Sequence, residues 1–246
     1  EASAVTNRVI DLCSKSMYEI IKPSVAIGIA TKTNSNQNIN EILSAAEEKM
    51  YTQKMDEGPK MRQNLLQNLL NTLNKKVTSN KKHTDNMENI IEQYCTFYNL
   101  DAEELVQCKT LARYHDIGRI IIDPEILNKV EPLSDSEWTK IKTHSEIGSR
   151  LIATIPELQQ FAPIILQHHE RFDGTGYPLG LKGNDISEKA RLLTILDSYE
   201  AMTSDRVYRP TKTHDEAINE ILRCTGTQFD PELVKKFIKI FEKANN

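Results

Sequence analysis

The feature that most constrains the fold is the helical spacing of apolar residues from Lys82 to the C-terminal end. Short segments marked by Pro or Gly separate these stretches, and we find no alternating strand pattern and no repeat of about 20 to 50 residues. Two helix starts are marked by their residues: Ser134 forms a capping box with Glu137, and Asp101 precedes the helix that runs towards His115. The sequence therefore predicts an all-α bundle for residues 81–246.

Residues 1–57 have a different pattern. The stretches "AVTNRVIDLCSKS" and "NINEILSAAEEKMYTQK" place apolar residues at helical spacing, and an Asn caps the second. Between them, "SVAIGIAT" is a short β-prone run that fits a buried strand. We therefore predict a small α-β-α fragment. Because a lone strand leaves its edge groups unpaired, this fragment is expected to need a sheet from other sequence or from another copy.

Residues 58–80 predict a linker helix between these two parts. Leu66, Leu69, Leu73 and Val77 recur at three- and four-residue steps, which gives one apolar stripe on an otherwise polar helix. This stripe has two interpretations, which the sequence leaves open. Either it pairs with the same stripe of a second copy in a homodimer, or it packs on the following domain.

Charge and cysteine content exclude several classes of protein. The formal net charge of -4 argues against a binder of nucleic-acid polymers or membrane surfaces, because such proteins carry a basic stripe. No apolar run is long enough to span a bilayer, and no signal-peptide pattern is present. The cysteines are far apart and have no C-x-x-C spacing, so we expect reduced thiols in a cytoplasmic protein; they are Cys13, Cys95, Cys108 and Cys224.

Titratable side chains fall on the inward faces of several predicted helices. His115 lies four residues after Leu111, and His144 lies three residues after Ile141. Asp197 also falls on a buried apolar face, where an isolated carboxylate is costly unless it is paired or binds a metal. A single inward histidine is usually an ordinary core residue, but several together favour a metal site.

The types of these residues indicate which metals they suit. Imidazoles mixed with carboxylates, without thiolates, suit iron, manganese, nickel or zinc, and a His-Asp pair suits two ions because one carboxylate can bridge them. The adjacent His168 and His169 are about 100° apart on a helix, so they share one site only at a helix end. The following "FDGTG" predicts such an end.

Four motifs together resemble the HD-GYP family of HD-type metal phosphohydrolases: "YHDIGR", "THSEIG", "HHERFDGTGYP" and "ILDSYEAMTSDRVYR". The resemblance runs from about residue 80 to 230, and the long histidine string makes it specific. It implies an HD-type helical bundle that hydrolyses cyclic di-GMP to linear pGpG or GMP. Two metal ions would activate a water for this reaction, so no protein nucleophile is required.

The resemblance also implies a set of metal ligands. Asp116 would bridge two ions, iron or manganese in preference to nickel or zinc. Some family members carry a Glu that holds a third metal, but this chain has Ser79 there, so we expect two. The ligands matched by motif are His83, His115, Asp116 and Asp197 for one ion, and Asp116, His144, His168 and His169 for the other.

Further residues are matched to substrate contacts and catalysis. The resemblance implies catalytic roles for Asp116 and Arg119, where Arg119 replaces the family's usual Lys and can grip two phosphate oxygens. Arg206 and Arg209 match the family's other phosphate-binding cations, with surface solubility as the alternative. Gly174, Gly176, Tyr177 and Pro178 form a turn-rich segment, the GYP loop. This loop is expected to line the guanine pocket or to bind a partner such as a GGDEF domain; the alternative is a rigid connector.

The first 57 residues carry a second resemblance. "SVAIGIAT" followed by "AAEEKMYTQKMDEG" is similar to the C-terminal end of a GGDEF domain, but the motif that carries cyclase activity is absent. Two alternatives to a cyclic di-GMP phosphodiesterase stay open. One is a metal-containing receptor for cyclic dinucleotides with little turnover, and the other is a hydrolase for a different cyclic dinucleotide, such as a mixed guanine-adenine ring.

Overall fold

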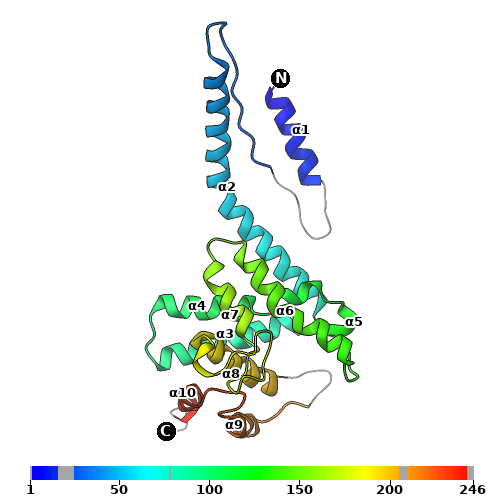
Figure 1. Cartoon of the computed structure of the whole chain (residues 1–246), viewed down its shortest axis with the longest axis vertical. Coiled ribbons are helices and arrows are strands. Elements are labelled where there is room, and N and C mark those ends of the chain that lie inside the picture. The colour runs from blue at the N-terminus through cyan, green and yellow to red at the C-terminus, as the bar shows by residue number, and fades with distance from the viewer. Residues whose placement is uncertain (1, 16–24, 78, 205–209, 243–246) are drawn as a thin grey trace. The chain divides into compact units, whose positions relative to one another are not determined.

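The computed structural model describes residues 2–15, 25–77, 79–204 and 210–242. Within these ranges the regular structure is helical, and a single isolated bridge joins Thr225 to Phe229. The chain divides into two compact units, Glu1–Asn71 and Thr72–Asn246 (Figure 1). The predicted all-α bundle is confirmed. Among the described helices, none combines the length and the apolar character that crossing a membrane requires.

The first unit contains helix α1 (Ala2–Lys15) and the first part of helix α2 (Ile39–Lys76), as the apolar spacing predicted. The side chain of Asn38 caps α2, because its Oδ1 accepts the N–H of Asn40 over 3.0 Å. Helix α2 runs without interruption through Pro59. The predicted boundary between residues 57 and 58 therefore lies inside one helix.

The predicted strand is the one element of the α-β-α fragment that the structure contradicts. Residues 25–33 have no regular structure, and no strand forms in the described ranges. The segment is instead held along α2: Gln53 accepts the N–H of Ile27 over 2.8 Å, and Lys49 donates to the carbonyl oxygen of Ile29 over 3.0 Å. A strand requires a neighbour for its backbone groups, and side chains of α2 supply only isolated bonds.

Of the linker helix predicted over residues 58–80, residues 58–76 form the C-terminal half of α2, which ends at Lys76, and Asn80 already begins α3. Leu73 and Val77, the part of the apolar stripe that belongs to the second unit, are 1% and 8% exposed. These two side chains are therefore covered in the single chain. Their burial favours the packing interpretation for this part of the stripe, and a homodimer through the linker stays a prediction.

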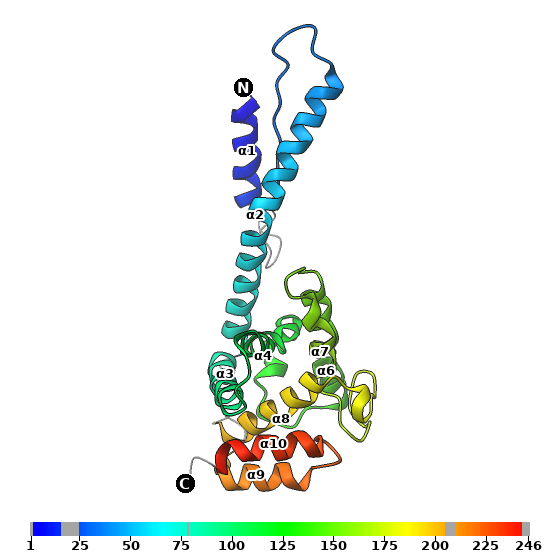
Figure 2. The same cartoon turned by 90° about the vertical axis from the view of Figure 1, so that its left-hand side faces the viewer.

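The second unit is a bundle of α-helices and short 3-10 helices (Figure 2). Both predicted helix starts are confirmed: Asp101 caps α4, and Ser134 and Glu137 form the capping box of α6. The elements are α3 (Asn80–Phe97), α4 (Ala102–Tyr114), η1 (Ile117–Ile121), α5 (Pro124–Leu127), α6 (Asp135–Ala153), η2 (Gln159–Phe161), α7 (Ala162–Gln167), η3 (Gly183–Asp185), α8 (Glu188–Thr203), α9 (His214–Arg223) and α10 (Pro231–Glu242).

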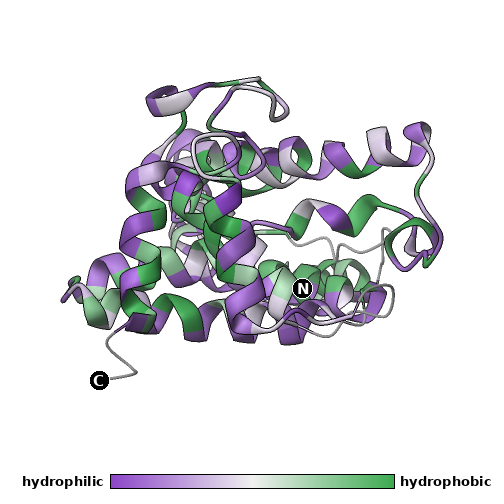
Figure 3. Cartoon of the chain, turned by 90° about the horizontal axis from the view of Figure 1, so that it is seen from below, coloured by the Kyte–Doolittle hydropathy of each residue, from purple (hydrophilic) through white to green (hydrophobic). Residues whose placement is uncertain are grey.

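The core of this unit lies where α3, α4, α6, α7 and α8 meet. Figure 3 shows hydrophobic and hydrophilic residues alternating along the helices. Met87, Ile117 and Ile165 are fully buried. Gly118 brings η1 against α6 so closely that a Cβ on it would lie 2.0 Å from the carbonyl oxygen of His144. This close approach sets the His-Asp dipeptide beside α6.

Candidate metal centre

The predicted ligands come from the ends and inner faces of separate helices. His83 lies in the first turn of α3, His115 follows the last residue of α4, and His144 lies within α6. Helix α7 ends at Gln167, so His168 and His169 follow directly, as the glycine-rich sequence predicted. The structure gathers the seven predicted ligands into two groups: Asp116, His144, His168 and His169, and His83, His115 and Asp197.

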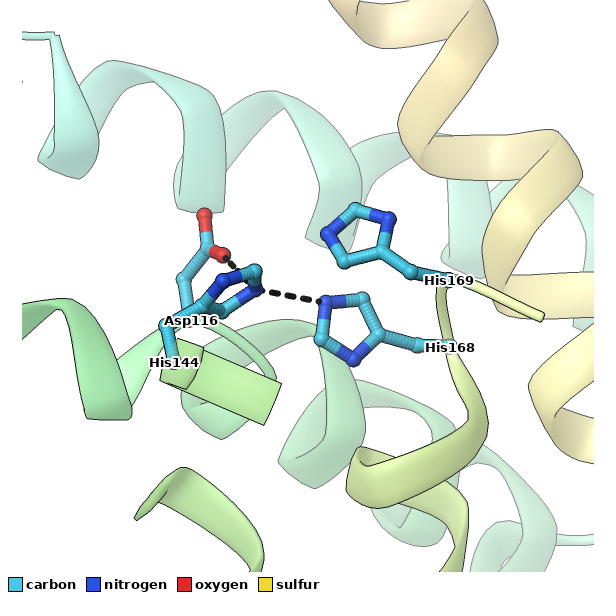
Figure 4. A group of neighbouring side chains, drawn as sticks. All are labelled: Asp116, His144, His168 and His169. Atoms are coloured by element: carbon cyan, nitrogen blue, oxygen red, sulfur yellow. Dashed lines mark hydrogen bonds and ion pairs between the residues drawn. The ribbon is translucent and has the colours of Figure 1, made fainter. Parts of the chain in front are cut away.

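Within each group, the possible ligand atoms lie within 4.8 Å of one another. Figure 4 shows the first group, in which the carboxylate and the three rings converge on one space. Asp116 also connects the groups. Its Oδ1 lies 3.5 Å from Nε2 of His144, and its Oδ2 lies 3.5 Å from Nε2 of His115. One carboxylate thus faces both groups, which is the arrangement that bridges two ions.

Backbone carbonyls fix which ring nitrogen of three histidines is free. Nδ1 of His115, His144 and His168 lies 2.9, 2.6 and 2.6 Å from the carbonyl oxygens of the residues three positions earlier. A carbonyl only accepts hydrogen bonds, so each Nδ1 must donate. In the neutral imidazole, Nε2 then carries a lone pair that points into the centre.

These lone pairs face each other in a way that a cation would relieve. The Nε2 atoms of His144 and His168 are 3.2 Å apart, and those of His83 and His115 are 3.3 Å apart. Two bare acceptors at this separation, as at Nε2 of His144 and His168, repel each other. Two nitrogens bound to one ion at about 2.1 Å lie at a similar separation, roughly 3.0 to 3.4 Å for angles between octahedral and tetrahedral. The residues therefore fit one divalent ion in each group.

Burial and charge set the protonation of the centre. Burial lowers the pKa of both His144 and His168 to about 3, which keeps the two rings neutral. Burial alone would raise the pKa of Asp116, but the Arg119 guanidinium and the surrounding imidazoles of His115, His144 and His83 together outweigh burial and hold that pKa well below the ordinary range. Neutral imidazoles and an ionised carboxylate are the forms that bind metals.

One buried residue of the centre was missed at the sequence level. Glu200 is 1% exposed, and its Oε2 accepts a hydrogen bond from Nδ1 of His83. Burial would lower the pKa of His83, but the carboxylates of Glu200 and Asp197 outweigh burial and raise it. Glu200 orients His83 so that its Nε2 faces His115, as carboxylates do for metal-bound histidines. The available signal was its position three residues after Asp197, on the same helix face.

A second buried carboxylate, also missed, organises the loop after His169. Glu170 is 2% exposed, and its two carboxylate oxygens accept the backbone N–H groups of Leu179, Gly180 and Leu181 over 2.6, 3.2 and 3.1 Å. Gly176 packs on the same segment, since a Cβ there would lie 2.5 Å from Cα of Glu170. The signal was a Glu directly after the two histidines.

Of the residues predicted to contact substrate, the structure describes Arg119 and Tyr177. Nε of Arg119 lies 2.9 Å from Oδ1 of Asp116, but the two atoms form an ion pair without hydrogen-bond alignment. Both atoms are buried and lack a hydrogen-bond partner in the described part of the chain, which leaves Asp116 able to bind a cation. The Tyr177 ring stacks on His169 with centroids 4.9 Å apart. Arg206 and Arg209 lie outside the described residues.

Two cavities open beside the first ligand group. The first has a volume of about 560 Å³ and is lined by Arg119, His144 and the segment that links α5 to α6, which contributes Val130, Pro132 and Leu133 together with the charged Lys129 and Glu131. The second has a volume of about 590 Å³ and is lined by α6 and by the loop that follows α7. Trp138, His169 and Tyr177 line both cavities, so a ligand at His169 can extend into either one.

The sequence of this chain is similar to those of known proteins. The family described as HD domain matches residues 64–233. A cyclic di-GMP phosphodiesterase of Vibrio cholerae is 39% identical over 139 residues, which cover 54% of this chain and 28% of that protein. A cyclic di-GMP phosphodiesterase of Thermotoga maritima is 41% identical over 131 residues, which cover 52% of this chain and 36% of that protein.

A solved structure shares the fold. The HD domain of the phosphodiesterase PgpH from L. monocytogenes, in complex with cyclic di-AMP, superposes with a TM-score of 0.51 at 17% identity, and covers 72% of this chain and 96% of that one. The chain spans about a third of the length of the two curated relatives, 28% and 36%. Regions of those proteins beyond the shared part have no counterpart in the alignment.

Proposed function

We propose that this chain, which belongs to the HD domain family, is a metal-dependent phosphodiesterase of the HD-GYP type that hydrolyses cyclic di-GMP to linear pGpG, GMP or both. The observation that carries this proposal is the pair of His/Asp groups that meet at Asp116 beside two cavities. The relatives in Vibrio cholerae and Thermotoga maritima support the choice of substrate.

Two divalent ions would be held by the two groups, with Asp116 between them. Imidazole and carboxylate ligands suit iron or manganese best, and nickel or zinc also accept them. When bound, the ions supply an activated water and neutralise charge on the phosphoryl oxygens. The residues that would hold them are His83, His115, Asp116 and Asp197 for one ion, and Asp116, His144, His168 and His169 for the other.

Other residues would bind and orient the substrate. Arg119 lies at the edge of the first cavity next to Asp116, where its planar guanidinium can donate to two phosphate oxygens. Tyr177, stacked on His169, would hold that ring in place and offer the sugar or base an aromatic surface. We propose Arg206 and Arg209 as further phosphate-binding cations on the resemblance of their motif alone.

The test is product analysis by chromatography. The chain is incubated with cyclic di-GMP and either Mn²⁺ or anaerobic Fe²⁺, and linear pGpG or GMP is expected. Asp116→Ala should abolish product, because it removes the ligand shared by both groups. Asp215→Ala, which changes an exposed carboxylate on α9, serves as the control and should keep full activity. Product formation by Asp116→Ala at the unaltered rate would refute the proposal.

A specific observation bears on each of two alternatives. The complex of PgpH with cyclic di-AMP favours a hydrolase for another cyclic dinucleotide. The complete ligand set favours the enzyme over a receptor in which the substrate is bound but not turned over, and Arg119, in place of the usual Lys, is the one feature that bears on that second alternative. Parallel incubations with cyclic di-AMP and with the mixed guanine-adenine cyclic dinucleotide distinguish the first alternative from hydrolysis of cyclic di-GMP. Nucleotide binding with two metals but no product separates the second.

Further proposals concern partners. The loop that Glu170 holds contains Leu179, which is 56% exposed, and we propose this loop as a contact for a partner such as a GGDEF domain. Residues 1–57 are proposed as the end of a GGDEF-like domain on sequence resemblance. Deleting these residues should change the oligomeric state or the activity if they have a regulatory role, and a deletion without either effect would remove that role.

A further inference from the structure

One face of helix α6 lines the second cavity with three different kinds of side chain. Asp135, Trp138 and Lys142 follow one another at steps of three and four residues, so they lie on the same side of the helix. The sequence places a carboxylate first, an aromatic ring second and an ammonium group third. The outer two are two helical turns apart, about 10.5 Å along the axis.

The two charged groups of this face are available to a ligand. In the described ranges, the carboxylate of Asp135 accepts no hydrogen bond and forms no ion pair, and the ammonium group of Lys142 contacts only the Tyr177 ring, 5.4 Å from its centroid. Arg171, on the opposite wall of the cavity, differs in that its guanidinium already donates to Thr175 and Gln228. Asp135 and Lys142 on α6 are therefore the charged groups of this cavity that can still form hydrogen bonds with a ligand.

The position of Trp138 fits a ligand that occupies both cavities. Its side chain is 48% exposed, which is unusual for a large aromatic ring, and it lines both the first and the second cavity. His169, a member of the first ligand group, lines both cavities as well. A dinucleotide whose phosphodiester lies at His169 would therefore direct one base into the second cavity.

We propose that the second cavity is a guanine-selective base subsite, in which Trp138 stacks on the purine, Asp135 accepts hydrogen bonds from guanine N1–H and the N2 amine, and Lys142 donates to O6 or N7. This inference rests on the proposed function, because it takes a cyclic dinucleotide as the ligand. Asp135 and Lys142 are then the residues that discriminate guanine from adenine.

The chemistry of the two purines explains the selectivity. Guanine presents donors at N1 and N2 and acceptors at O6 and N7, so it complements an acceptor on one side of the stacking ring and a donor on the other. Adenine presents an acceptor at N1, which would face the carboxylate of Asp135, and a donor at N6 where guanine has the O6 acceptor. Because N7 accepts from Lys142 in both purines, the discrimination rests mainly on Asp135. A site built for one hydrogen-bonding pattern rejects the other because its own polar groups are left unpaired.

The test uses the chain's one tryptophan as a reporter. Metal-loaded protein is titrated with hydrolysis-resistant phosphorothioate analogues of cyclic di-GMP and cyclic di-AMP, and Trp138 fluorescence is followed. The unaltered chain should bind the guanine analogue roughly ten- to hundredfold more tightly, the range of one or two hydrogen bonds to a charged group. Asp135→Asn should bring the ratio of the two affinities close to one, because its amide can also pair with adenine.

Asp215→Asn is the matched control, since Asp215 also lies in the first turn of a helix with a capping box. It should leave the ratio of affinities unchanged. An Asp135→Asn ratio equal to that of the control would overturn the guanine selectivity. Guanine-analogue binding measured by calorimetry without any change in Trp138 fluorescence would overturn the stacking.

The outcome also separates this inference from the proposed enzyme. Guanine-selective quenching of Trp138 without hydrolysis of cyclic di-GMP would support the base subsite and refute the activity. Hydrolysis of both cyclic di-GMP and cyclic di-AMP, at rates whose ratio Asp135→Asn does not alter, would support the activity and overturn the subsite.

Discussion

The substitution Glu200→Gln tests how the metal centre is held together. Glu200 is buried, and its carboxylate accepts hydrogen bonds from His83, Asn86 and Ser204. A glutamine keeps the size of the side chain but replaces one acceptor oxygen by a donor amide. His83 then loses the partner that keeps its proton on Nδ1 and leaves Nε2 free towards His115.

The expected magnitude follows from the role of such carboxylates. Removing an outer partner of a ligating histidine costs about 10- to 100-fold in metal affinity, or roughly 1.4 to 2.7 kcal/mol. The loss should fall on the ion of the group His83, His115 and Asp197, because Glu200 contacts His83 and no member of the other group in the described hydrogen bonds and ion pairs. The other ion should keep its affinity.

The assay is a competition titration of Mn²⁺ or Zn²⁺ against a chromophoric chelator, which resolves two affinities. Glu188→Gln is the control, since it changes an exposed carboxylate at the start of the same helix. Equal affinities for both ions in Glu200→Gln and in the control, with unaltered thermal unfolding, would refute the idea that Glu200 holds His83 for a metal.

Further predictions concern stability. Glu170→Ala leaves three backbone N–H groups without their acceptor and should lower the free energy of unfolding by about 2 to 4 kcal/mol in urea denaturation. Gly118→Ala should lower it by about 1 to 3 kcal/mol or more, because its Cβ meets a carbonyl at 2.0 Å, whereas Gly58→Ala meets only the end of an Arg side chain and should not destabilise. In the metal-free protein, His144 and His168 have pKa values of about 3, below the unfolded value of roughly 6.5, so both take up protons on unfolding and stability should fall as pH decreases from about 6.5. The raised pKa of His83 acts in the opposite direction, but it is one group against two. Urea denaturation that gives a lower free energy of unfolding at pH 7 than at pH 5.5 would contradict the prediction.

The helices of the second unit follow from local sequence. Apolar spacing and the residues at helix starts, such as Ser134 with Glu137, specify helices without reference to the rest of the chain. The expected strand at residues 24–31 was wrong for the opposite reason. A strand depends on backbone groups of a neighbour, which β-prone residues alone do not provide.

The members of the candidate site were predictable to different degrees. Asp197 was found because a carboxylate interrupts an apolar face, and the same reasoning extends to Glu200, one turn later. Glu170 could not be found in this way, because its role depends on how the loop at Leu179 folds back onto it. The cavities on the two sides of Trp138 depend on the packing of distant segments, which residue spacing does not reveal.

We propose that two ions share Asp116 in a centre that cleaves a cyclic dinucleotide. It is tested most directly by measuring metal content by mass spectrometry and cyclic di-GMP hydrolysis on the same preparations of the unaltered chain and of Asp116→Ala. We expect about two metals per chain with linear product, and loss of both product and metal in the variant. A chain that hydrolyses cyclic di-GMP without metal, or an Asp116→Ala variant with both metals and full activity, would contradict it.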